Sequence, residues 1–151
     1  MRFEQTSDLL RYVRDLHEEL ADAYSNLAEK VPDRRNRMLL DYMAVREKGG
    51  AESVAAFARN STTLAVKEFD PAMLNPVRLR KRLASELQPD SSTDEILDFG
   101  LEAHDWFLGL YDTLLDKSKT EELKALFKNL RDRTSKGKEK LARNANMLMD
   151  F

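Results

Sequence analysis

Apolar residues recur at intervals of three and four over two long stretches in each half of the chain. This spacing places them in a stripe along one side of an α-helix. Val31-Pro32-Asp33 interrupts the first pair of stretches, because proline cannot continue a helix. The pattern predicts four long helices and one short helix, over residues 7–30, 33–59, 76–87, 93–117 and 120–148.

Short links within each pair of long helices predict two antiparallel hairpins, at about 7–59 and 93–148. A crossover over residues 60–92, which contains the short helix, joins them. A lone hairpin cannot hide its apolar stripe, whereas two hairpins facing each other can. We therefore expect an all-α fold, a four-helix bundle with one long crossover, in a single domain of 1–151.

Two helix starts carry a recognisable capping pattern. Ser92 and Glu95 have the spacing of a capping box, in which a serine hydroxyl and a glutamate satisfy each other's backbone amides. Ser118 and Glu121 repeat this spacing and predict a second capping box, at the start of the last helix.

The two hairpins look like copies of one unit. The only two histidines, His17 and His104, each lie seven residues before a tyrosine. Shifting the sequence by 87 residues against itself gives 12 identities in the 55 pairs that start at residue 6, without a gap. Roughly three or four would arise from composition alone. The identities are the counterparts Thr6/Thr93, Leu10/Leu97, His17/His104, Tyr24/Tyr111, Leu27/Leu114, Lys30/Lys117, Leu39/Leu126, Arg46/Arg133, Gly50/Gly137, Glu52/Glu139, Ala55/Ala142 and Ala58/Ala145.

Composition narrows the class of protein. A net charge of −2 with both signs mixed along the chain argues against binding to nucleic acid or to anionic lipid. The absence of cysteine excludes disulfides and thiolate metal sites, and no apolar run is long enough to span a bilayer. We expect a soluble cytoplasmic protein.

The short helix carries Arg78, Arg80, Lys81 and Arg82, which form either a solvated face or a small docking patch for an anion.

Unusual residues occupy the middle of the four stripes. His17, Glu47, His104 and Thr134 stand where apolar residues belong, and a two-fold arrangement brings them to one level. Gly50 and Gly137 lie one turn beyond Glu47 and Thr134, which leaves space in the interior. A buried carboxylate needs a partner, and the two histidines are the nearest candidates.

The spacing of these residues resembles a known family. The segment His17-Glu-Glu-Leu-Ala-Asp-Ala-Tyr24, followed by Glu47-Lys-Gly-Gly50, is similar to one half of a rubrerythrin-type, ferritin-like bundle, and residues 104–137 are similar to the other half. In that family each half supplies a glutamate and then a Glu-x-x-His, which together hold two iron or manganese ions. Here two histidines replace the single glutamates, and only Glu47 keeps the ligand type. The resemblance therefore implies a ferritin-like fold that has lost its dinuclear metal site.

Three hypotheses follow for function. The first is a structural, binding or assembly module without a cofactor. The second keeps one iron, manganese or zinc ion on His17, Glu47 and His104, and would make the protein a metal-dependent oxidoreductase if it is an enzyme. The third is a small-molecule pocket in the bundle core. The candidate pocket residues are Tyr24, Gly50, Phe107, Tyr111 and Gly137. We also expect a homodimer.

Overall fold

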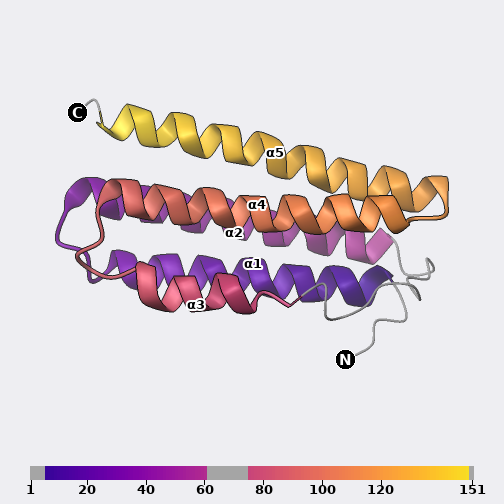
Figure 1. Cartoon of the computed structure of the whole chain (residues 1–151), viewed down its shortest axis with the longest axis horizontal. Coiled ribbons are helices and arrows are strands. Elements are labelled where there is room, and N and C mark those ends of the chain that lie inside the picture. The colour runs from indigo at the N-terminus through magenta and orange to yellow at the C-terminus, as the bar shows by residue number, and fades with distance from the viewer. Residues whose placement is uncertain (1–5, 61–74, 150–151) are drawn as a thin grey trace.

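The computed structural model describes residues 6–60 and 75–149, which form an all-helical five-helix bundle without strands in the described part (Figure 1). The helix positions agree with those expected from the apolar pattern. Of the expected crossover, residues 61–74 lie outside the described residues. The five helices are α1 (Thr6–Ala28), α2 (Arg34–Asn60), α3 (Val77–Glu86), α4 (Thr93–Lys117) and α5 (Glu121–Met149).

The four long helices run side by side, with α5 and α1 at opposite edges of the view in Figure 1. The most extensive packing is between α1 and α2 and between α4 and α5, while α2 contacts both helices of the second pair. Side chains also join α1 to α4, because the Tyr24 ring meets the Phe99 ring edge-on, with centroids 6.1 Å apart. The core therefore lies between two helical pairs that are sequential in the chain.

Most of the expected apolar stripe of α1 is buried, and further residues are buried beside it. Within residues 7–30 the three-four spacing includes Leu10, Val13 and Leu20, which are inaccessible, and Leu27, which is partly buried. Leu9 and Leu16 are buried as well. Contacts with both α2 and α4 require a wider apolar face than a single neighbour would. None of the helices in the described part has an apolar stretch of the length needed to cross a bilayer.

A polar network joins the two helical pairs at one end. The Asn36 side chain, buried near the start of α2, donates to the backbone carbonyl of Ser91 at 3.1 Å and accepts from the Thr93 hydroxyl at 2.6 Å. Buried amides that satisfy both their donor and acceptor groups favour one arrangement of the elements they join. This network fixes the start of α4 against the start of α2.

One of the two predicted capping boxes is confirmed and the other is wrong. Ser92 accepts from the Glu95 amide at the start of α4, and the Glu95 side chain accepts from the Ser92 amide. Ser118 instead ends α4, with its hydroxyl bonded to the Leu114 carbonyl, and the Thr120 hydroxyl accepts from the Leu123 amide at the start of α5. Threonine and serine cap helices almost equally well, so spacing alone chose the wrong residue.

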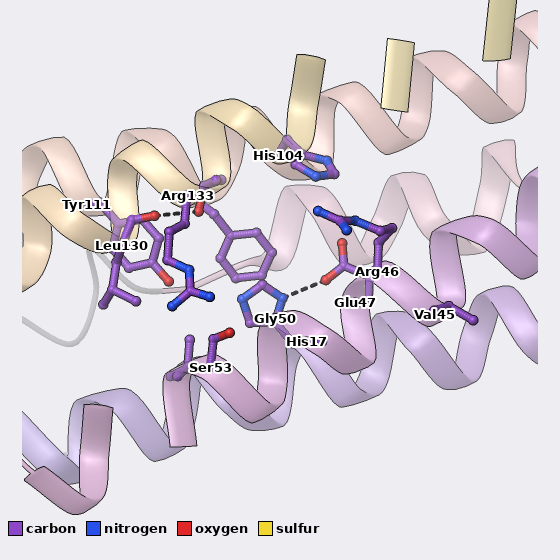
Figure 2. Close-up of a pocket in the computed structure, with 15 residues that line it drawn as sticks. His17, Val45, Arg46, Glu47, Gly50, Ser53, His104, Tyr111, Leu130 and Arg133 are labelled. Atoms are coloured by element: carbon purple, nitrogen blue, oxygen red, sulfur yellow. Dashed lines mark hydrogen bonds and ion pairs between the residues drawn. The ribbon is translucent and has the colours of Figure 1, made fainter. Parts of the chain in front are cut away.

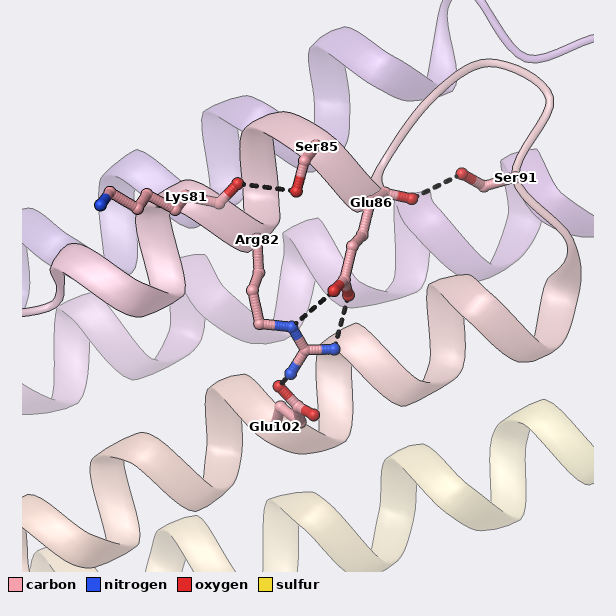
Figure 3. Close-up of polar contacts among 6 residues, drawn as sticks. All are labelled: Lys81, Arg82, Ser85, Glu86, Ser91 and Glu102. Atoms are coloured by element: carbon pink, nitrogen blue, oxygen red, sulfur yellow. Dashed lines mark hydrogen bonds and ion pairs between the residues drawn. The ribbon is translucent and has the colours of Figure 1, made fainter.

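Helix α3 packs against α4 and runs beside α1 in Figure 1, and its cations are partly used by these two helices (Figure 3). Arg82 pairs with Glu86 on its own helix and with Glu102 of α4, and Arg80 makes two-nitrogen contact with Glu19 of α1. These exposed pairs add little stability but orient the helix. The expected docking patch for anions is therefore reduced, because two of its four cations already have carboxylate partners.

Candidate functional site

A cleft of about 360 Å³ opens between the two helical pairs, near the middle of each long helix (Figure 2). It brings together His17, Glu47, His104 and Thr134, the four residues expected to meet at one level. The glycines that follow them, Gly50 and Gly137, lie in its wall. The remaining lining residues are Val45, Arg46, Gly49, Ser53, Val54, Phe107, Tyr111, Leu130 and Arg133.

His17 is bound tightly to Glu47 in the cleft. Its Nδ1 lies 2.5 Å from Oε2 of Glu47, and both side chains are buried, at 9% and 7% exposure. The His17 ring also stacks on Phe107, with centroids 4.0 Å apart and planes 7° from parallel. A histidine held by a carboxylate on one side and an aromatic face on another has almost no rotational freedom. The expected need of Glu47 for a partner is therefore met by His17.

Gly50 is a glycine because His17 occupies the space of its side chain. A Cβ at position 50 would lie 3.0 Å from Nδ1 and 3.1 Å from Cε1 of His17. Such contacts are tighter than normal, and His17 cannot move away without leaving Glu47 or Phe107. The space that Gly50 provides in the interior is thus used by the imidazole.

His104 has a different environment from its counterpart. Its Nδ1 lies 2.8 Å from the carbonyl oxygen of Gly100, one turn earlier in α4, so Nδ1–H donates to that carbonyl and Nε2 lies on the other side of the ring. A Cβ at Gly137 would lie 3.4 Å from that Nε2, an ordinary contact. Thr134, the counterpart of Glu47, donates its hydroxyl to the Leu130 carbonyl at 2.8 Å. The second half therefore lacks the carboxylate that orients His17.

The two tyrosines occupy different cavities. Tyr111 lines the main cleft, whereas Tyr24 lines an adjoining void of about 10 Å³ together with Glu47 and His104. The Tyr24 hydroxyl is buried and has no hydrogen-bond partner within the described residues. Burial, and then the negative charge of Glu47, raise the pKa of both phenols above the usual value. Each tyrosine is therefore neutral at physiological pH.

Sequence reasoning named eight of the cleft residues as candidates but did not assign two arginines to the site. Arg46 of α2 and Arg133 of α5 both line the cleft, and Figure 2 shows their side chains entering it from different helical pairs. The signal was present, because these arginines are counterparts in the 87-residue repeat. Among the described residues neither forms an ion pair, in contrast to Arg131, which contacts Asp112 and Asp132.

The donor set does not fit a dinuclear metal centre. In the part of the chain that the structure describes, Glu47 is the only carboxylate that lines the cleft, and two divalent ions need several anionic ligands to balance four positive charges. In the described part of the chain, no three side chains of histidine, aspartate or glutamate are grouped so that they could hold a metal ion. The Nδ1 atom of His17 and the Oε2 atom of Glu47 point at each other.

No family model, curated protein or solved structure matches this chain. The all-helical arrangement is compatible with a ferritin-like fold.

Proposed function

We propose that this protein is a ferritin-like four-helix bundle, made of a duplicated hairpin, that has replaced a dinuclear metal centre with a cleft for a small organic molecule. It acts as a binding module and not as a metalloenzyme. The similarity of spacing over residues 17–50 and 104–137 supports the first half of this proposal. The chemistry of the cleft supports the second.

The observation that carries the proposal is the cleft itself. Helical cores are normally packed with few voids larger than a water molecule. A space of about 360 Å³ falls within the range of small-molecule sites, which are mostly apolar with a few fixed polar groups. Phe107, Leu130 and Val54 supply apolar wall, and the two oriented imidazoles supply fixed polar groups.

A neutral aromatic probe tests whether the cleft accepts a ligand. Trp106 is the only tryptophan of the chain, and its ring meets the Phe107 ring edge-on with centroids 5.1 Å apart. Since Phe107 lines the cleft, we expect benzyl alcohol to change Trp106 fluorescence saturably and to raise the melting temperature.

Two leucine substitutions provide the matched comparison. Gly137→Leu places a side chain in the cleft and should abolish the response to benzyl alcohol. Gly109→Leu is the control, because Gly109 is exposed and a Cβ there meets nothing within 4 Å. The proposal fails if benzyl alcohol gives no saturable response in the unmodified protein, or if Gly137→Leu responds as strongly as Gly109→Leu.

A single metal ion on His17, Glu47 and His104 is the competing function. It would require the 2.5 Å contact between His17 and Glu47 to open, so that both could turn toward His104. Reconstitution of tag-free protein with iron(II), manganese(II) or zinc(II), followed by metal analysis, separates the two functions. Binding of one equivalent that is lost in His104→Ala would replace the ligand-binding proposal.

A homodimer stays a prediction. Large apolar side chains are exposed at scattered positions, namely Met38, Val45, Val77 and Met147, and they do not define one surface. Sedimentation equilibrium on the full chain would give the mass directly. A monomer at all accessible concentrations would refute the dimer without affecting the cleft.

A further inference from the structure

The charged groups of the cleft do not balance. Arg46 and Arg133 each bring a positive charge, and Glu47, the only carboxylate that lines the cleft among the described residues, is bonded to His17. Before the imidazoles are counted, the lining therefore has two positive charges and one negative charge. Arg80 and Arg82 of α3 have carboxylate partners, whereas neither cleft arginine forms an ion pair among the described residues.

The excess charge is greatest on the wall formed by α4 and α5. That wall contributes His104, Arg133 and Thr134, and no carboxylate of either helix lines the cleft. The Thr134 hydroxyl donates to the Leu130 carbonyl, so it does not compensate a cation. Apolar surface from Phe107 and Leu130 lies beside these groups.

We propose that the cleft binds a small organic anion, a carboxylate or a phosphate monoester, whose charged group contacts Arg46 and Arg133 and whose apolar part lies against Phe107. This inference rests on the proposed function and specifies its ligand class. Guanidinium groups suit such a ligand because their planar array of donors matches carboxylate and phosphate oxygens. Figure 2 shows the two arginine side chains on either side of the His17 ring, which stacks on Phe107.

A series of probes with one ring and different charges tests the inference. Benzylammonium, benzyl alcohol, benzoate and phenyl phosphate carry similar apolar parts, and their dissociation constants can be measured from Trp106 fluorescence. We expect benzoate and phenyl phosphate to bind about 10- to 100-fold more tightly than benzyl alcohol, as for hydrogen bonds to charged groups. Benzylammonium should bind more weakly than benzyl alcohol. Inorganic phosphate should compete poorly, because it lacks the apolar part.

Arginine variants assign the charge preference to the cleft. Arg46→Gln and Arg133→Gln remove exposed side chains and should keep the fold, which circular dichroism checks. Each should lose most of the preference for anions while still binding benzyl alcohol. Arg131→Gln is the matched control, because Arg131 lies on the same helix as Arg133 but does not line the cleft. It should leave the whole series unchanged.

The possible results separate the two proposals. Equal binding of all four aromatic probes, or an anion preference that survives both Arg46→Gln and Arg133→Gln, overturns the anion inference and leaves the cleft as a neutral site. Inorganic phosphate that binds as tightly as phenyl phosphate overturns the requirement for an apolar part. Failure of every probe to bind overturns the proposed function itself.

Discussion

Replacing Gly50 with alanine tests whether the His17–Glu47 contact is rigid. The added Cβ would lie 3.0 Å from Nδ1 of His17, the nitrogen that is bonded to Glu47. The imidazole could relieve this contact only by tilting away from Phe107, with which it is stacked, or by leaving the carboxylate. Either movement weakens an interaction between buried groups.

The adjacent residue provides the reference. Gly49 lies in the same helix, and a Cβ there meets nothing within 4 Å. Gly49→Ala should therefore stabilise the protein by about 1 kcal/mol, the usual difference between glycine and alanine in a helix. Gly137→Ala should give a similar gain, because its Cβ would make only an ordinary contact, 3.4 Å from Nε2 of His104.

Gly50→Ala should gain the same helix stabilisation as Gly49→Ala, but it should weaken the contact between His17 and Glu47. A hydrogen bond to a charged group is worth about 1.5–3 kcal/mol. The net effect is a destabilisation of about 0.5–2 kcal/mol, which places this variant about 1.5–3 kcal/mol below Gly49→Ala. For a chain of this size the two melting temperatures should differ by about 5 °C.

Urea unfolding, followed by circular dichroism and Trp106 fluorescence, measures these differences. Coincident transitions by the two probes establish that unfolding is two-state. A Gly50→Ala protein as stable as Gly49→Ala would refute the reasoning, because it would mean that His17 can move at no cost. The glycine would then have no connection to the histidine.

Three further outcomes are expected. Because burial raises the pKa of Tyr24 and Tyr111, the folded protein above pH 10 keeps two phenolic protons that the unfolded chain releases. These groups should therefore leave the free energy of unfolding unaffected below pH 10 and lower it above pH 10, by up to about 2.7 kcal/mol per pH unit. Tyr24→Phe should show half that slope, and equal slopes for the two proteins in urea titrations would contradict this. At pH 7, Tyr24→Phe removes a buried hydroxyl without a described partner and should leave stability unchanged or raise it by about 1 kcal/mol, so a clear loss in thermal melts would reveal an unrecognised partner. Asn36→Leu should lower the free energy of unfolding by about 1–3 kcal/mol, because the Thr93 hydroxyl and the Ser91 carbonyl before α4 lose their partner. The control Asn129→Leu, at an exposed position, should change it by less than about 0.5 kcal/mol. Similar losses in the two variants would show that the network contributes nothing specific.

The helices were predictable because their signals are local. Three-four spacing of apolar residues, Pro32 after the first helix and the Ser92–Glu95 capping box each act within one or two turns, and the structure confirms all three. Ser118 shows the limit of such reasoning. Its hydroxyl bonds to a carbonyl of the preceding helix, and Thr120, two residues on, caps the next. Two neighbouring cap residues cannot be ranked by spacing alone.

The candidate residues of the cleft could also be predicted from the sequence, because an internal repeat marks equivalent positions. His17, His104, Gly50 and Gly137 could be grouped in this way before any coordinates were known. The same repeat contains Arg46 and Arg133, but identity alone does not tell whether an arginine faces solvent on the outside of a bundle or borders a cleft. That depends on the rotation of each helix about its axis.

The positions of the helices, and the polar residues that interrupt their apolar stripes, follow from the amino-acid sequence. The difference between the two histidines arises from helix packing, with His17 held by Glu47 and stacked on Phe107, and His104 bonded to its own helix. Helix packing also brings two arginines to the border of the same space. The physical reason is range: helix formation depends on residues within about four positions, whereas contacts between residues thirty or more positions apart depend on how whole helices pack.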